Sequence, residues 1–163
     1  MPLIRGGAFV ADPYAAIDDA APLPSSGGFS VSLARFKRER SDILARNASV
    51  GLRLKSDESP EQIADDVGRF SMIALEFPRF RDGRAFSWAR MLRTRFAFKG
   101  ELRGTGHFLY DQINFMQRTG FDAFEVGEGF SIELYERALK EMSAAYQPSS
   151  DGRKTIRELR QKR

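Results

Sequence analysis

Short apolar segments alternate along the chain with segments whose apolar residues recur at helical spacing. The strand-like segments are residues 29–33, 50–54, 72–77, 101–104 and 121–126. In the second of these, Val50, Leu52 and Leu54 alternate with small or charged residues, which is typical of a half-buried strand. Residues 72–77 form the only continuous apolar strand, so the pattern predicts an interior position in the sheet, covered on both faces.

The segments between the predicted strands each carry one apolar stripe, which indicates amphipathic helices. These segments are residues 34–46, 60–70, 85–97, 107–119 and 130–145. Five strand–helix units in succession predict an α/β fold with a mainly parallel sheet and right-handed crossovers. Two closures fit this order. We favour an open sheet with helices on both faces, and the alternative is a partial (half) β/α barrel.

The pattern divides the chain into three parts. Residues 1–28 carry two short apolar pieces around Gly6 and Gly7, which predicts an N-terminal hairpin that ends in a loop rich in proline, serine and glycine. Residues 29–147 hold the strand–helix units and form the α/β domain. Residues 148–163 are polar and strongly basic, and they are predicted to be a disordered tail.

Composition narrows the class of protein. A chain of 163 residues with 42% hydrophobic residues is long enough for one domain with its own core. It contains no run of about 18 apolar residues, so no transmembrane helix is expected, and its first residues show no apolar export signal. The absence of cysteine excludes disulfides, thiolate zinc sites and cysteine-bound iron–sulfur clusters. These features predict a cytoplasmic protein with no evident cofactor and no metal site.

The basic charge is concentrated in two places. Residues 77–103 carry eight arginine or lysine residues against two acidic ones, and residues 152–163 carry six against one. The rest of the chain is acidic, because the net charge of the whole chain is only +4. The sequence has neither an RNA-binding aromatic motif nor a helix-turn-helix pattern, so nucleic acid is a disfavoured partner.

The strongest candidate site is the loop of residues 78–84, which leaves the end of the predicted central strand and enters a helix. Ligands of parallel sheets bind at the carboxyl ends of strands, and helix N-termini favour anions. Arg79, Arg81 and Arg84 bring guanidinium groups suited to sulfate, sulfite or phosphate oxygens. Gly83 belongs to the same loop, and Asp82 is placed to orient one arginine. The alternative is a plain turn at Asp82-Gly83 with solvated arginines.

A second set of residues is predicted to support this site. They are Glu76, Asp82, Arg103, Gly104, Gly106, Asp111, Gln112 and Glu125. A projection at 100° per residue puts Gln112 on an apolar face with Phe108, Phe115 and Met116, so the amide should be buried and bonded, either to a neighbouring loop or in the site. The two glycines lie between a strand and a helix, where backbone N–H groups can approach a ligand, but they make no dinucleotide-binding fingerprint.

Two further possibilities concern proton transfer and metal binding. Glu76 and Glu125 lie near the ends of two different strands and can face each other across the site, as paired carboxylates do in acid–base or Mg²⁺ chemistry. His107 is the only histidine and has no histidine or cysteine partner, so a catalytic or metal-binding role for it is not expected. The catalytic residues, if the protein is an enzyme, are not identified by these patterns.

Several sequence blocks together resemble a bacterial family, the domain of unknown function 934 family, over roughly residues 30–146. The blocks are Ala74-Leu-Glu-Phe-Pro-Arg-Phe-Arg-Asp-Gly-Arg84, Ser87-Trp-Ala-Arg-Met-Leu-Arg93, Gly100-Glu-Leu-Arg103, Asp111-Gln112 and Gly120-Phe-Asp-Ala-Phe124. The chain departs from the family pattern at His107, where an acidic or polar residue is usual, and at Thr119, where members often have cysteine.

The resemblance implies a pathway rather than a reaction. Members of the family are commonly labelled oxidoreductases of sulfite reduction, because their genes lie beside those of sulfate and sulfite assimilation. It therefore implies an accessory or anion-binding protein of sulfite and sulfate reduction, with sulfite reductase or another sulfur-assimilation enzyme as a partner. The alternative is a small enzyme whose phosphate- or sulfate-bearing substrate binds at the strand ends. An oxidoreductase activity rests on the family label alone, and the oligomeric state is open.

Overall fold

The structure, a computed structural model, describes residues 1–141, 146–149 and 151–161. These residues form one eight-stranded sheet with the order β2-β1-β8-β7-β6-β5-β4-β3. The strands are β1 (Leu3–Arg5), β2 (Ala8–Val10), β3 (Tyr14–Ala16), β4 (Gly28–Ser32), β5 (Val50–Leu54), β6 (Met72–Phe77), β7 (Glu101–Gly106) and β8 (Ala123–Glu125). The helices are α1 (Leu33–Arg38), α2 (Arg40–Leu44), η1 (Pro60–Arg69), α3 (Arg84–Thr94), η2 (Tyr110–Gln112), α4 (Ile113–Thr119), α5 (Ile132–Lys140) and α6 (Ile156–Arg160).

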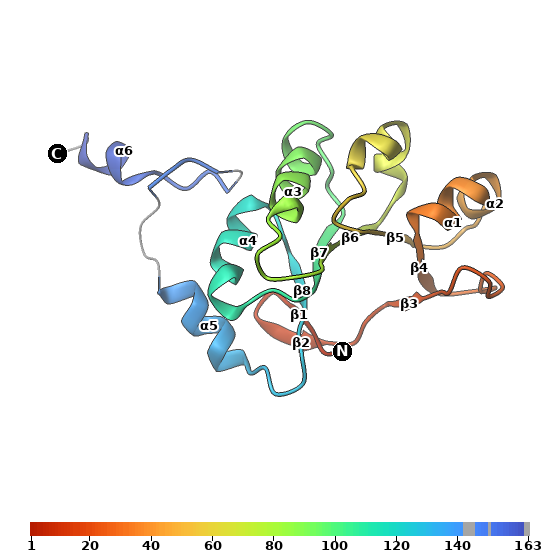
Figure 1. Ribbon diagram of the computed structural model, residues 1–163, viewed down its shortest axis with the longest axis horizontal. Helices are drawn as coiled ribbons and strands as arrows, with labels where there is room; N and C mark the ends of the chain where they lie inside the picture. Colours follow the sequence, from red (N-terminus) through yellow and green to blue (C-terminus); the bar gives the residue numbers. More distant parts are fainter. Residues whose placement is uncertain (142–145, 150, 162–163) are drawn as a thin grey trace.

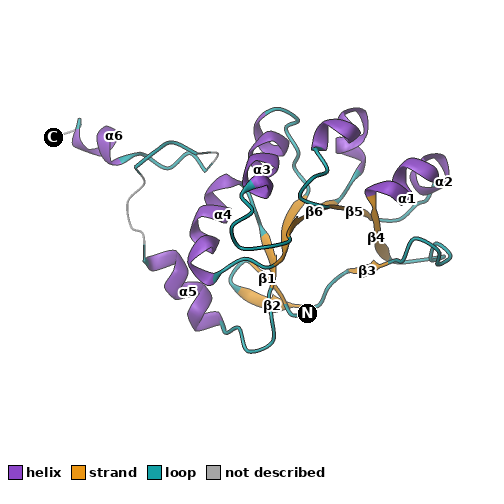
Figure 2. Cartoon of the chain, viewed as in Figure 1, coloured by secondary structure: helices purple, strands orange, loops and turns teal. Residues whose placement is uncertain are grey.

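The sheet curls into a half-barrel, and its helices follow the outside of the curve (Figure 1). The orange strands in Figure 2 trace the same arc, whose inner side is turned toward the N-terminus. The α/β class, the mainly parallel sheet and the N-terminal hairpin predicted from the sequence are confirmed. Of the two predicted closures the half-barrel is the one that forms, and within the described part of the chain helices do not cover both faces.

Strand β6 occupies the interior position that its apolar run predicts. It pairs in parallel with β5 on one side, where Leu52 lies opposite Ile73, and with β7 on the other, where Ile73 lies opposite Leu102. Strands β3 to β8 all pair in parallel, and the hairpin of β1 and β2 joins the sheet through an antiparallel pairing of β1 with β8. The short strand β3 is an addition that the sequence pattern does not predict.

Alternation along the strands explains why only one face of the sheet carries helices. The residues that point to the helices are apolar and form the core, among them Phe29, Val31, Leu52, Ile73, Leu75 and Leu102. The residues between them on β5, β6 and β7 include Arg53, Glu76 and Arg103. Because charged side chains cannot be buried under an apolar helix face without partners, this second face stays concave and uncovered.

The predicted helices are shorter than their apolar stripes suggest. The first divides into α1 and α2 at Glu39, and η1 consists of 3-10 turns interrupted at Ile63, which has a non-helical φ of −126°. The predicted helix at residues 107–119 is wrong over its first turn, because Gly106 has a φ of +88° and residues 107–109 leave the strand without helical structure. The end of the predicted helix at residues 130–145 lies outside the described residues.

The C-terminal segment contains more structure than its composition predicts. Residues 156–160 form α6, where Thr155 and Glu158 make a reciprocal capping box. Asp151 forms an ion pair with Arg118 of α4, with 3.0 Å between the side-chain oxygen and nitrogen. The pattern Thr155-x-x-Glu158 is a helix-start signal that the basic composition obscures. No described helix is long and apolar enough to cross a membrane.

Candidate functional site

The concave face of the half-barrel holds a cavity of about 410 Å³, a size typical of small-molecule sites. Strands β4 to β8 form its floor, and the segment that contains Asp12 and Tyr14 forms one wall. The cavity reaches the carboxyl ends of the strands, where Lys55, Glu76 and Gly106 line it. This is the edge at which parallel sheets hold their ligands.

The floor of the cavity is arranged in rows, because parallel strands place alternate residues side by side. The middle row runs from Ser32 through Arg53, Ala74 and Arg103 to Ala123. The small side chain of Ala74 separates the two arginines and lines the cavity between them. The cavity floor therefore carries two guanidinium groups with different surroundings.

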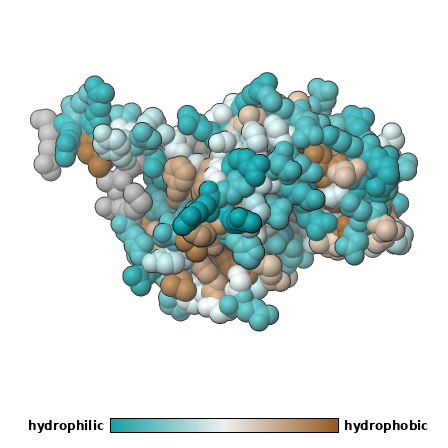
Figure 3. All heavy atoms as spheres, viewed as in Figure 1, coloured by the Kyte–Doolittle hydropathy of each residue, from teal (hydrophilic) through white to brown (hydrophobic). Residues whose placement is uncertain are grey.

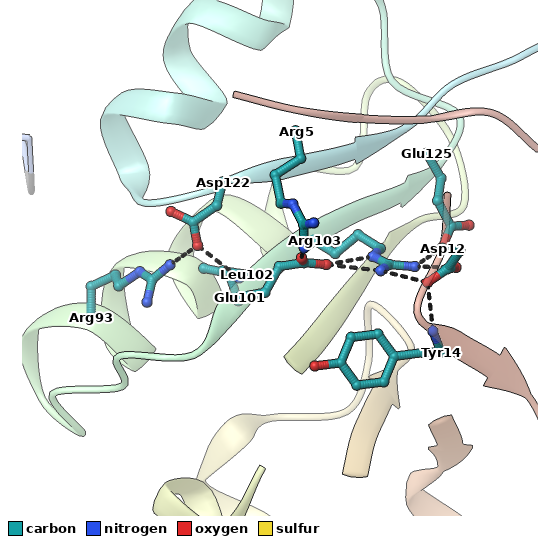
Figure 4. Close-up of polar contacts among 9 residues, drawn as sticks. All are labelled: Arg5, Asp12, Tyr14, Arg93, Glu101, Leu102, Arg103, Asp122 and Glu125. Atoms are coloured by element: carbon teal, nitrogen blue, oxygen red, sulfur yellow. Dashed lines mark hydrogen bonds and ion pairs between the residues drawn. The ribbon is translucent and has the colours of Figure 1, made fainter. Parts of the chain in front are cut away.

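Arg103 is the most completely paired of these two groups. Its side chain is 1% exposed and donates hydrogen bonds of 2.6 Å and 3.0 Å to the carboxylate of Asp12. It also donates to Glu125 at 2.9 Å and to Glu101 at 2.9 Å, and Glu101 in turn accepts a bond from Arg5 (Figure 4). Arg103 thus fastens the N-terminal segment to β7 and β8.

These ion pairs shift the pKa values of both Arg103 and Asp12. Burial by itself would lower the pKa of Arg103, but its hydrogen bonds to Asp12, Glu125 and Glu101 outweigh burial and raise it above the ordinary range of arginine. Burial likewise would raise the pKa of Asp12, and the bonds from Arg103 and from the Tyr14 N–H lower it instead. Arg103 therefore remains charged and fully occupied, so it serves as a structural centre of the cavity wall.

Arg53, unlike Arg103, is only partly hydrogen-bonded. One nitrogen, Nη2, donates to the carbonyl of Ile17 at 3.0 Å, whereas the Nε atom is buried and has no hydrogen-bond partner among the described residues. Lys55, two residues further along β5, lines the same cavity, and no ion pair involves it within the described part of the chain. Arg53 and Lys55 are the cations of the cavity that remain available to a ligand.

Glu76 and Glu125, which the sequence suggests as facing carboxylates, both line this cavity. Glu125 accepts a hydrogen bond from Arg103. The side chain of Glu76, in contrast, makes no hydrogen bond or ion pair within the described residues. Among those residues no group of three or more histidine, aspartate or glutamate side chains is placed to hold a metal ion. Glu76 is thus the free carboxylate of the site.

The predicted anion loop, residues 78–84, lies at the same edge of the sheet but outside the cavity lining. Arg84 is engaged with Asp82, at 2.7 Å between Nη2 and the carboxylate, and it donates to the hydroxyl of Ser56 at 2.9 Å. The bonds from Arg84 hold the pKa of Asp82 well below its usual range. Asp82 therefore orients an arginine as predicted, and the pair ties this loop to the loop after β5.

The other arginines of the loop differ from Arg84. Arg81 lies over the ring of Phe80, with 5.3 Å between its guanidinium carbon and the ring centre. Arg79 is exposed and takes part in no ion pair within the described part of the chain. Gly83 is the N-cap of α3 and contributes no side chain. Anion binding by Arg79 and Arg81 stays a prediction.

Two of the predicted supporting residues, Asp111 and Gln112, lie in η2. Gln112 is half-buried rather than buried; its amide donates to the carbonyl of Phe80 at 3.0 Å and accepts from the N–H of Leu109 at 2.9 Å. The predicted bonding to a neighbouring loop is therefore confirmed, and full burial is wrong because helix α4 begins later than the projection assumes. Asp111 is exposed beside it.

Gly104 and Gly106 lie where a side chain would clash with neighbouring atoms. A Cβ atom on Gly104 would lie 2.3 Å from the end of Met116, so its lack of a side chain permits close packing on the helical side of the sheet. A Cβ on Gly106 would lie 2.5 Å from the carbonyl oxygen of Phe77, and the positive φ of Gly106 turns the chain away from β6. The exposed His107 follows this turn and donates its backbone N–H to that same carbonyl.

The sequence pattern does not predict four residues of the cavity: Arg53, Lys55, Asp12 and Tyr14. For Arg53 and Lys55 the available signal is their alternation with Leu52 and Leu54, which indicates a strand with one charged face. For Asp12 and Tyr14 no local signal exists, because they reach the cavity through a strand that joins the sheet next to β4.

The fold and the cavity define a class: a half-barrel α/β protein with a charged concave pocket at the carboxyl ends of its strands. Residues 51–157 match the family described as bacterial protein of unknown function (DUF934), and the chain belongs to this family. The match begins at β5 and extends to α6, so it includes most of the cavity floor. No curated protein and no solved structure matches the chain.

Proposed function

We propose that this protein binds a small oxyanion, or a small molecule that carries one, in the concave cavity, with Arg53 as the main anion ligand. The observation that supports this proposal is the buried Nε–H of Arg53, which has no partner among the described residues. An unsatisfied buried donor costs roughly 1–3 kcal/mol, and an anion that accepts its hydrogen bond removes this cost.

The chemistry of Arg53 suits such a ligand. The Nε and a terminal nitrogen of a guanidinium group bind two oxygens of a sulfate, sulfite or phosphate group in parallel. Lys55 supplies a second positive charge at the strand end, and the small Ala74 lines the cavity next to Arg53. Arg103 does not compete for the anion, since three carboxylates already occupy its nitrogens.

We further propose sulfite or sulfate as the anion, in an accessory role for sulfite and sulfate reduction. This step rests on the resemblance of residues 74–124 to a family labelled by that pathway, and not on the cavity. The cavity is larger than a bare sulfite ion, so a nucleotide sulfate is a second ligand of the same chemistry. A pull-down with sulfite reductase tests the proposed partner.

A second candidate function is an enzyme for a phosphate- or sulfate-bearing substrate, and the observation that favours it is Glu76. Its carboxylate lines the cavity and has no partner among the described residues, so it is free to accept a proton from a water molecule that attacks the sulfur or phosphorus atom of a substrate held by Arg53 and Lys55. The new bond to the water oxygen forms as the bond to the leaving sulfate or nucleotide breaks. Turnover of a nucleotide sulfate, followed by phosphorus NMR and abolished in Glu76→Gln, distinguishes this enzyme from a binding protein.

Isothermal titration with sulfite, sulfate, phosphate and adenosine phosphosulfate tests the binding proposal. We expect Arg53→Gln to weaken binding by tenfold or more, which is about 1.4 kcal/mol. Arg69→Gln, on the exposed end of η1, is the matched control and should bind as the wild type does. If Arg84→Ala weakens binding and Arg53→Gln does not, the anion belongs to the loop of residues 78–84. If no oxyanion binds, the proposal is wrong.

A further inference from the structure

Three large apolar side chains are exposed close together outside the cavity. Phe80 is 46% exposed, Leu109 46% and Phe115 48%. They come from the loop after β6, the loop after β7 and helix α4, and Gln112 connects them through its bonds to the backbones of Phe80 and Leu109. Gln112 thus holds Phe80 and Leu109 beside the start of α4, and Phe115 lies one helical turn further along this helix. We call these three exposed side chains the apolar patch.

Arginines surround the apolar patch. Arg81 lies over the ring of Phe80, and Arg79 is its neighbour in the same exposed loop. Arg90 of α3 lines a surface hollow together with Phe115. None of these three arginines takes part in an ion pair within residues 1–141, 146–149 and 151–161. Figure 3 shows strongly hydrophilic and apolar side chains side by side on this part of the surface, in front of α3 and α4.

We propose that the apolar patch and its arginines form a docking surface for an acidic segment of a partner protein that carries apolar anchor residues. Phenylalanine and arginine are enriched at the centres of protein interfaces and supply most of their binding energy. The apolar side chains and the cations alternate on this surface, since Arg81 lies over Phe80 and Arg90 shares a hollow with Phe115. The three arginines have no ion-pair partner among the described residues and outnumber Asp111, the exposed carboxylate beside Gln112, so negative charges are favoured opposite them.

The same charges argue against a second copy of this chain as the occupant. Two copies that face each other through this surface would bring Arg79, Arg81 and Arg90 of each near those of the other, and like charges oppose such contact. The docking surface is also independent of the anion site. No residue of the apolar patch and none of the three arginines lines the concave cavity.

A defined peptide provides the test on the full-length protein. The probe is a labelled 12-residue peptide in which glutamate alternates with phenylalanine and leucine, and its binding is followed by fluorescence anisotropy and by NMR shifts. Two control peptides replace glutamate with lysine, or phenylalanine and leucine with alanine. Single-stranded DNA of 12 nucleotides tests nucleic acid as the occupant, and sedimentation tests a second copy.

We expect the acidic apolar peptide to bind, with affinity that falls as salt rises, and the control peptides to bind at least tenfold more weakly. Phe80→Ser and Arg81→Glu should each weaken binding by tenfold or more. Phe9→Ser, at a phenylalanine of similar 47% exposure on β2, and Arg69→Glu are the matched controls and should have no effect. Absence of peptide binding at about 1 mM overturns the proposal. Tighter binding of the DNA, or self-association abolished by Phe115→Ser, overturns it too.

Discussion

Replacement of Arg103 by methionine removes the centre of the charge cluster and leaves three carboxylates facing one another. Asp12, Glu101 and Glu125 all lose their strongest partner, while only Arg5 remains to contact Glu101. The arginine side chain is 1% exposed, and Glu101 is 10% exposed, so water compensates only part of the loss. Loss of one member of a buried ion pair costs about 3–5 kcal/mol, and we expect Arg103→Met to fall in this range.

The magnitude is large relative to the whole stability of a domain, which is about 5–15 kcal/mol. For a chain of this size each kcal/mol lowers the melting temperature by about 2–4 °C, so the expected decrease is roughly 6–20 °C. Chemical denaturation in urea, followed by circular dichroism, gives the free energy of unfolding directly. Asp12→Asn serves as a milder companion, because Asp12 is 37% exposed and water replaces part of its bond.

A third variant separates charge from packing. In Arg103→Met combined with Glu101→Gln and Glu125→Gln the two less exposed carboxylates are neutral, and of the three former partners only Asp12, which is 37% exposed, keeps its charge. Replacement of buried ion pairs by neutral groups is often close to neutral in stability. We expect this triple variant to recover most of the loss. If Arg103→Met costs less than about 1 kcal/mol, or if the triple variant is no more stable than the single one, the cluster does not act as described.

Two further predictions concern the loops at the carboxyl ends of β6 and β7. Because the bonds from Arg84 depress the pKa of Asp82, this carboxylate stabilises the fold above the ordinary pKa of aspartate, and the contribution is lost as pH falls toward the depressed value. Urea titrations should therefore find Asp82→Asn less stable than the wild type at neutral pH and no different in strong acid; a difference that grows in acid contradicts this. Gly106→Ala should cost about 1–3 kcal/mol, because the residue has a φ of +88° and a Cβ would lie 2.5 Å from the Phe77 carbonyl oxygen. Gly127→Ala, with open space around its Cα, is the control for thermal unfolding, and equal melting temperatures of the two variants would contradict the role given to Gly106.

Strand β6 and Gln112 show which features the local sequence pattern predicts and which it does not. The apolar run at residues 72–77 predicts the interior position of β6 correctly. Ile73, Leu75 and Phe77 pack in the core under the helices, whereas Met72 and Ala74 are buried on the concave face, which the described helices do not cover. The prediction for Gln112 is right about its bonding and wrong about its depth. The error comes from Gly106, which turns the chain and delays the helix, so that Phe115 points to solvent.

The sequence by itself predicts the succession of strands β4 to β8 with the helices between them, their parallel pairing and the N-terminal hairpin, because these follow from the apolar pattern of each segment. Only the tertiary structure adds β3 to the sheet and decides which distant charges become partners. Arg103 meets Asp12 across 91 positions of sequence, and no local pattern specifies this contact. The same holds for Arg53 and Arg84, which look equally available in the sequence. Folding places Asp82 and Ser56 around Arg84 and leaves the Nε of Arg53 without a partner, and this difference moves the proposed anion site into the concave cavity.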